Sequence, residues 1–456
     1  MKYALDSSSS VNSYRIVYFQ VAPESIEYMG VADASSHCRG RAVMVTTPVD
    51  LGRVQTWEAY PVTWSYSVKW IRDPKTTWSE RWNVYVNASR GEGQIHWFGI
   101  INSLMIVLFL TAMVAMIMLR TLNADFQKYN STDPEETETG WRLIHGDVFR
   151  APPRSSLFSS LVGSGTQILA MGVITMVLAT LGFLSPANRG LLVTAGIVLF
   201  IWMGVLGGYV SGRMYHMFGG VNWKKNAFYT ATIVPGVIFG VLFFLNIFLW
   251  AKHSSASIPF LYLLALVALW FCLSVPLTIL GAHFATKRPP VQHPVRVLNI
   301  PRAVPPQVWY LNPLFSILLG GVLPFGAIFI ELFFLFSSVW LQQIHYLFSF
   351  LFLIFIILII ACSEISVVMV YFQLCGEDHA WWWRSFLTPA ASAFYVLLYS
   401  LFYFVSTLKI TSFVAAVLYF GYSFCMAVTI FVVTGAIGYH ASFWFVTKVY
   451  GSVKFA

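Results

Sequence analysis

The stretch FYTATIVPGVIFGVLFFLNIFLWA, residues 228–251, contains no charged side chain. A helix needs about 20 apolar residues to cross a hydrocarbon core of about 30 Å, and this stretch meets that length. Of the 456 residues of the chain, 57% are hydrophobic and only 10% are charged. A soluble globular chain carries roughly 25% charged residues. The composition therefore predicts that most of the surface faces lipid.

Further runs of similar length and apolar character occur along the chain. Together they predict nine membrane spans at about 97–119, 160–184, 190–211, 228–251, 258–282, 314–340, 345–372, 388–407 and 412–437. The connectors hold too few polar residues to build the solvated surface of a large soluble protein. The sequence therefore predicts a polytopic α-helical membrane protein, which we divide into residues 1–95 and a transmembrane domain over 96–456.

The positive residues are distributed unevenly between the two sides of the predicted bundle. Most Lys and Arg residues lie in the connectors after spans one, three, five and seven and in the C-terminal tail, whereas the opposite connectors hold only Arg189, Lys252 and Lys409. Since cytoplasmic loops retain positive charge, we expect a luminal N-terminus and a cytoplasmic C-terminus. The net charge of +9 is dispersed over short loops, which argues against nucleic acid as a partner.

Residues 1–95 show the alternation of β-branched or aromatic residues with polar ones that is typical of strands, as in YRIVYFQVA (14–22) and VTWSYSVKW (62–70). This pattern predicts the C-terminal portion of a β-rich luminal domain. Asn87 begins an Asn-Ala-Ser sequon and is a candidate glycosylation site. Because no apolar signal segment is present, we expect further luminal residues before Met1 in the natural chain; the alternative is that the first span carries the short segment across the membrane.

Two cytoplasmic connectors are long. The first, 120–159, contains the acidic stretch STDPEETETG, expected to be solvated, and then WRLIHGDVFRAPPR, expected at the membrane surface or docked on the bundle. The second, 283–313, holds seven prolines and predicts an extended strap. Its apolar residues favour packing against its own helices over serving as a proline-rich ligand for another protein.

The segment YFQLCGEDHAWWWRSF (371–386) crowds acids, a histidine, a cysteine and three tryptophans between two spans. A metal site needs ligands that converge from a fixed geometry, and no second ligand pair is found elsewhere, so we predict no metal and no other cofactor. Trp381, Trp382 and Trp383 are predicted to anchor the chain in the headgroup zone. Arg384 can pair with lipid phosphate or with a neighbouring acid. The five cysteines form no disulfide framework.

Two acidic residues lie inside predicted spans, Glu331 in the sixth and Glu364 in the seventh. Ionisable groups in hydrocarbon are costly and commonly mark function. Glu331 follows a stretch rich in Gly and Pro, a pattern found at transporter sites. The alternative is that each acid accepts hydrogen bonds from hydroxyl or backbone groups of a neighbouring helix and so stabilises the bundle.

Small residues recur at helical spacing in two spans. Gly204, Gly208 and Gly212 form GxxxGxxxG, and Gly236 with Gly240 forms GxxxG. Such spacing lets helix backbones approach closely, either inside the protein or against a client helix. No phosphate-binding loop, zinc-protease motif or nucleophile motif is present, so we expect no enzymatic activity.

Four stretches resemble the nonaspanins, the nine-transmembrane superfamily. They are IHWFGIINSLMIVLFLTAMVAMIMLRTL (95–122), GWRLIHGDVFRAP (140–152), PFGAIFIELFF (324–334) and YFQLCGEDHAWWWRSF (371–386). The resemblance implies a luminal β-rich domain followed by nine helices, in Golgi and endosomal membranes, and a role in sorting membrane proteins with glycine-rich spans. It also implies coat recognition through a C-terminal Lys-x-acid signal, of which this chain has Lys454 but not the terminal acid.

Three functional hypotheses follow from the sequence. The first is a sorting receptor whose partners are client transmembrane proteins and membrane lipids. The second is a proton-coupled transporter or channel that uses Glu331 and Glu364. The third is a scaffold that acts through its luminal domain and uses the helices as an anchor.

Overall fold

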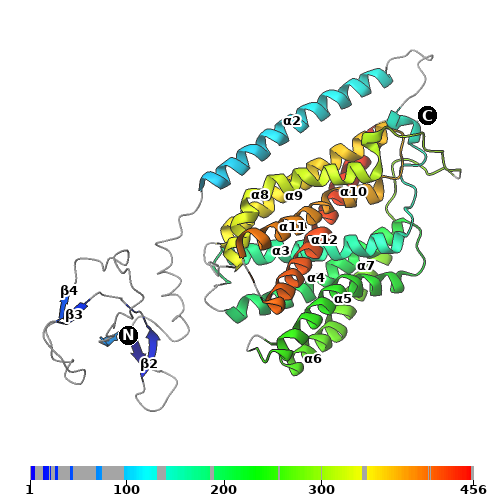
Figure 1. Ribbon diagram of the computed structural model, residues 1–456. Coiled ribbons are helices and arrows are strands. Elements are labelled where there is room, and N and C mark those ends of the chain that lie inside the picture. Colours follow the sequence, from blue (N-terminus) through cyan, green and yellow to red (C-terminus); the bar gives the residue numbers. More distant parts are fainter. Residues whose placement is uncertain are drawn as a thin grey trace. The chain divides into compact units, whose positions relative to one another are not determined.

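The computed structural model describes residues 2–5, 14–19, 21, 26–28, 42–44, 68–73, 97–130, 140–184, 189–254, 257–298, 300–340, 347–408, 410 and 412–452. The chain divides into two compact units, Met1–Gly93 and Gln94–Ala456. Figure 1 shows short strands in the first and a bundle of long helices in the second.

The described residues of the first unit form five short strands. β1 (Lys2–Leu5) lies between β2 (Tyr14–Tyr18), its antiparallel neighbour, and β5 (Ile71–Arg72), its parallel neighbour. A separate antiparallel pair joins β3 (Ile26–Tyr28) to β4 (Ala42–Met44). β2 coincides with one of the two alternating stretches. A larger β-rich domain stays a prediction, and Asn87 lies outside the described residues.

The second unit is helical. Its long elements are α2 (Trp97–Asn130), α3 (Ser155–Thr180), α4 (Arg189–Met217), α5 (Trp223–Ala251), α6 (Phe260–Leu269), α7 (Val275–Thr286), α8 (Pro313–Trp340), α9 (Leu347–Cys375), α10 (Trp381–Ala390), α11 (Ser392–Tyr403) and α12 (Phe413–Ser452). The π-helical turn η5 (Trp270–Ser274) joins α6 to α7, and η8 (Phe404–Leu408) extends α11. The 3-10 turns η4 (Gly140–Ile144) and η6 (Trp309–Leu311) lie in the long connectors.

Eight helical stretches of the described chain are long and apolar enough to cross a membrane. They are Val107–Ala124, Ser155–Thr180, Gly190–Met217, Trp223–Ala251, Phe260–Thr286, Leu351–Cys375, Trp381–Leu408 and Phe413–Ser452. The stretch Pro313–Phe329 of α8 is a shorter apolar helix at the predicted sixth span. The protein is therefore a polytopic helical membrane protein.

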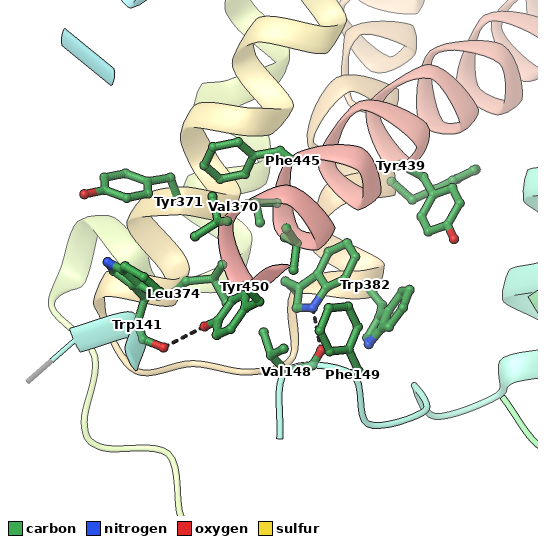
Figure 2. Close-up of a cluster of buried hydrophobic side chains, with 14 of the residues drawn as sticks. Trp141, Val148, Phe149, Val370, Tyr371, Leu374, Trp382, Tyr439, Phe445 and Tyr450 are labelled. Atoms are coloured by element: carbon green, nitrogen blue, oxygen red, sulfur yellow. Dashed lines mark hydrogen bonds between the residues drawn. The ribbon is translucent and has the colours of Figure 1, made fainter. Parts of the chain in front are cut away.

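The first long connector docks on the bundle. Residues 140–154, which we call the docked segment, bury Trp141, Ile144, Val148 and Phe149 at 3% exposure or less. Figure 2 shows rings and aliphatic groups of this segment against the ends of α9 and α12, with the Tyr450 hydroxyl directed at the Trp141 carbonyl, 2.6 Å away. We call this end of the bundle the cap end. Of the two expected positions for this stretch, docking is the one observed.

The proline-rich connector is extended, as predicted. Residues 287–308, which we call the strap, contain no helix or strand in their described part. The Leu298 amide donates to the Gly146 carbonyl at 2.8 Å, and the Phe149 ring stacks on His293. Gln307 donates to the Gly376 carbonyl at 2.8 Å. The strap thus packs against its own protein across the cap end.

Candidate functional site

An apolar cavity of about 330 Å³ lies within the helix bundle. Its walls come from α3, α4, α5, α12 and the α6–η5 junction. Large apolar side chains dominate the lining, among them Phe200, Phe239, Leu266 and Trp270. A cavity with such walls accepts an apolar guest and offers little to a hydrated ion.

The cavity lies where two helices depart from regular geometry. Pro235 on α5 has no backbone N–H, so the carbonyl of Ala231, four residues earlier, loses its helical donor. The Trp270 indole, at the start of η5, donates to this carbonyl at 2.9 Å. An unsatisfied carbonyl in hydrocarbon costs several kcal/mol, so this bond stabilises both irregularities together.

The glycines of α4 are occupied by a neighbouring helix of the same chain. An added Cβ at Gly208 would overlap the Thr278 carbonyl of α7, and one at Gly212 would lie 3.0 Å from the Ala285 side chain. Gly281 of α7 likewise touches the backbone of Val205 on α4. α4 and α7 are therefore in backbone contact toward the cap end, and the GxxxG spacing of α4 serves helix packing within the protein. Gly204 also faces α7, at 3.1 Å from the Thr278 hydroxyl.

The glycines of α5 are in different surroundings. An added Cβ at Gly236 would meet the Trp270 ring at 3.5 Å, an ordinary contact. Gly240, one turn further, is exposed and would meet nothing within 4 Å. Gly240 is not one of the residues that line the cavity. At about 100° per residue it points away from Ile238, Phe239 and Leu242, which do line it, so Gly240 lies on the outer face of α5. Of the five glycines predicted for helix association, Gly240 is the one with open space beside it.

Glu364 lies on α9 and accepts a hydrogen bond from the Thr111 hydroxyl of α2. It therefore joins two helices, which is the bundle-stabilising arrangement that the sequence left open. Glu331 lies on α8, and its side chain is outside the described part of the chain. The described structure thus gives no pairing between the two acids.

The three consecutive tryptophans act as a row of donors to the docked segment. Trp381, Trp382 and Trp383 donate through their indole N–H groups to the carbonyls of Val148, Arg150 and Pro153, at 2.8, 2.9 and 2.9 Å. The side chains of Trp381 and Trp382 are 0% and 2% exposed. These two rings are therefore enclosed by protein and do not reach headgroups. Trp383 is half-buried and stays a candidate for the headgroup zone.

The acids beside the tryptophans are paired with arginines. Arg384 lies 3.2 Å from the Asp378 carboxylate, which is the internal one of its two predicted pairings. In the docked segment, Asp147 accepts from the Arg150 side chain and, at 3.1 Å, from the Arg302 amide of the strap. Burial alone would raise the pKa of Asp147, but these hydrogen bonds outweigh it and hold the pKa below its usual range.

The chain matches a known protein family over most of its length. Residues 2–413 match the family described as Endomembrane protein 70. The chain is 48% identical to Transmembrane 9 superfamily member 9 of Arabidopsis thaliana, over 96% of this chain and 69% of the relative. The chain belongs to the nonaspanin, or transmembrane 9, superfamily. This confirms the resemblance found in the sequence.

Other nonaspanins are similarly close. Transmembrane 9 superfamily member 4 of Homo sapiens is 48% identical, over 97% of this chain and 69% of its own length. Member 2 of Homo sapiens is 47% identical, over 96% of this chain and 65% of its own length. No solved structure matches the chain. The cavity and the row of indole donors therefore have no counterpart in a matching solved structure.

Sequence reasoning missed the cavity and the bond that supports it. Pro235 inside an otherwise regular span was the available signal, since a proline in a helix frees the carbonyl four residues earlier. Nothing in the sequence pairs the Ala231 carbonyl with Trp270, 39 residues later. The donor is found only once α5 and the α6–η5 junction are placed side by side.

Proposed function

We propose that this nonaspanin sorts client membrane proteins by binding their transmembrane helices laterally against α5. The observation that carries the proposal is the exposed Gly240, which has open space beside it on a helix that also borders the apolar cavity. A client helix with glycines could approach the α5 backbone at Gly240. The α4 glycines are not offered for this role because α7 covers them.

Weak binding suits such a task. A polar contact between helices in a membrane contributes about 0.6 kcal/mol on average, so recognition rests on several small terms and stays reversible. A sorter must release its client at the destination. We place this activity in Golgi and endosomal membranes, with the N-terminus luminal and the C-terminus cytoplasmic. On this orientation Asn87 can carry a glycan. A coat contact at Lys454 stays in doubt because the terminal acid of the signal is absent.

The proposal is tested by surface delivery of two reporters that differ only in one helix, glycine-rich or leucine-rich, in cells depleted of the protein and then supplied with variants. Gly240→Leu fills the space beside the outer face of α5, where nothing lies within 4 Å. Gly326→Leu on α8 is the matched control, because its Cβ also meets nothing within 4 Å. Leu has higher helix propensity than Gly, so neither change should weaken its helix.

We expect Gly240→Leu to leave the glycine-rich reporter undelivered and Gly326→Leu to restore it as wild type does. Delivery of the leucine-rich reporter should be unchanged throughout. Equal rescue by both variants would show that clients do not bind the face of α5 that carries Gly240. Full rescue by the luminal unit on an unrelated membrane anchor would instead favour the scaffold function.

Transport is the second candidate, because Glu364 is an ionisable group bonded across two membrane helices. It requires pH-dependent flux in vesicles that contain the folded protein. Glu364→Gln keeps an acceptor for Thr111 but cannot ionise, so loss of flux in this variant alone would support transport. Vesicles that stay silent between about pH 5 and pH 8 would exclude it.

A further inference from the structure

A long part of this chain contains positive charge and no negative charge. Between Asp147 and Glu331 the sequence has no acidic residue, while Lys and Arg recur at the helix ends. This part comprises α3 to α7 and the strap. Charges at those helix ends therefore have no acid close in sequence to neutralise them.

Four of these residues gather where α4 ends, α5 begins and α7 ends. We call them the cationic cluster: Arg213, Lys224, Lys287 and Arg288. Arg213 donates to the Pro289 carbonyl, and the guanidinium of Arg288 lies 5.8 Å from the centre of the Tyr209 ring, one turn before Arg213. These contacts hold the two arginines beside each other at the α4–α7 contact.

The α5 side of the cluster is built on an aromatic ring. The Trp223 ring lies 5.8 Å from the ring of His283, which is one turn before Lys287 on α7. The ammonium of Lys224 lies 5.8 Å from the centre of the same Trp223 ring. Lys224, Lys287 and Arg288 are exposed. The start of α5 and the end of α7 thus present their cations together.

No member of the cluster has an acidic partner among the described residues. The described residues form three ion pairs, and none of them includes a cluster residue. They join Arg150 to Asp147, Arg302 to Glu377 and Arg384 to Asp378, all elsewhere on the cap end. The cluster also lies at the ends of three apolar helices, Gly190–Met217, Trp223–Ala251 and Phe260–Thr286. Lipid headgroups meet a membrane protein at this level, where aromatic rings are also enriched.

We propose that the cationic cluster binds the headgroup of an anionic lipid that carries more than one phosphate, in the leaflet at the cap end. Arg forms bidentate bonds to phosphate, and Lys adds a point charge on a flexible stem. Basic pockets between membrane helices bind such headgroups. Four cations that pair with no acid in the described part of the chain match a headgroup with several negative charges better than one with a single charge.

The test uses the full chain in nanodiscs of neutral lipid, to which a phosphatidylinositol bisphosphate is added and its binding measured by native mass spectrometry. Arg213→Gln/Arg288→Gln removes two cations and keeps an uncharged polar side chain at both positions. Lys252→Gln/Lys448→Gln is the matched control, because it removes two exposed lysines outside the cluster. Each cation near a membrane surface contributes about fivefold to binding, so the cluster variant should bind about 25-fold more weakly and the control as wild type does.

Further measurements decide the proposal. If the cluster variant does not fold, Lys224→Gln/Lys287→Gln takes its place, and it should weaken binding because both side chains belong to the cluster and are exposed. Equal binding by cluster and control variants would overturn the proposal. So would equal binding of phosphatidylserine at matched charge, or of the free inositol phosphate. Lipid binding that appears only after Glu135→Gln/Glu136→Gln would show that the chain's own acidic connector occupies the cluster, and would also overturn it.

Discussion

The hydrogen bond from Trp270 to the Ala231 carbonyl shows how two unfavourable residues stabilise each other. Pro235 removes a helical donor, and the indole N–H supplies another from a different helix. Neither residue is well placed without its partner, since a proline in a helix and a polar N–H in lipid are both costly alone. The pair thus stabilises the part of the cavity wall where α5 meets η5.

Trp270→Phe should lower the free energy of unfolding by about 1–3 kcal/mol, because it leaves the Ala231 carbonyl without a donor. In the background of Pro235→Ala the same change should cost much less, since an alanine on α5 at this point provides a backbone N–H to that carbonyl. The thermal unfolding of the four proteins in one detergent measures this coupling. Additive effects of the two substitutions would contradict the pairing.

Trp381 and Trp383 make the same kind of bond in different surroundings, so their replacement by Phe should have unequal effects. Trp381→Phe removes a fully buried donor to the Val148 carbonyl and should cost about 1–3 kcal/mol. The carbonyl that Trp383 bonds is within reach of water, and its loss should cost less. The rate at which a protease cleaves the docked segment measures how far each variant releases it from the bundle. Equal release would show that burial of the indole does not matter.

Asp147 makes the docked segment sensitive to acid. Its pKa in the folded protein lies below that of the unfolded chain, so its contribution to stability is complete above the unfolded pKa of about 3.9 and is lost as the pH falls through the folded value. The protection of residues 140–154 against hydrogen exchange, relative to the intrinsic rate at each pH, should therefore fall on acidification below about pH 4. Asp147→Asn should exchange faster at neutral pH and lose part of this acid response. An unchanged acid response in the variant would assign it to other groups.

At the scale of elements, one chain uses glycine spacing in two ways. The α4 glycines are covered by α7, whereas Gly240 on α5 faces open space. The α4 and α7 backbones touch toward the cap end, and α4, α5 and α6 border a cavity further along. The same motif is therefore structural on one helix and available for binding on the next.

Gly208→Leu and Gly240→Leu should differ in stability for this reason. At Gly208 the new side chain would overlap the α7 backbone, and overpacking typically costs about 1–3 kcal/mol or more. At Gly240 nothing stands in the way, and the gain in helix propensity should keep stability equal or slightly higher. Thermal unfolding of both variants measures the difference. A destabilised Gly240→Leu would mean that this face is packed.

The sequence predicted where the long helices of the described chain lie, because hydrocarbon imposes apolar runs of fixed length. It placed helix ends poorly where a helix continues out of lipid or begins with tryptophan. α2 runs on to Asn130, α12 to Ser452, and α10 begins at Trp381 although its span was predicted from residue 388. Polar residues in those parts hide them from a hydropathy pattern. The π turn η5 has no pattern of its own, since it arises from the fit of Trp270 to α5.

Side-chain roles were harder to predict because they depend on which elements meet. The run Trp381–Trp383 has the composition of a headgroup anchor, and only the docked segment turns two of its rings inward. The Gly204–Gly212 stripe fitted both internal packing and client binding until α7 was in place. Asn87 and Lys454 lie outside the described residues, and their predicted roles are unchanged.

At the scale of the whole molecule, the helical unit combines a closed end and an open cavity. The docked segment and the strap cover the ends of α9 and α12 at the cap end, and close glycine contacts join α4 to α7. The apolar cavity leaves space between α4, α5 and α6. A firm cap beside an accessible cavity suits a protein that binds helices and releases them without unfolding.

The measurement that tests this account most directly is site-specific photocrosslinking in membranes that contain a glycine-rich client. A photoreactive residue would replace Gly240 on the outer face of α5, and in separate proteins Gly326 on α8 or Leu298 on the strap. We predict client adducts from position 240 and not from 326 or 298, with fewer adducts when the client helix is changed to leucines. Equal adducts from 240 and 326, or none from 240 with a client that still depends on the protein, would contradict the account.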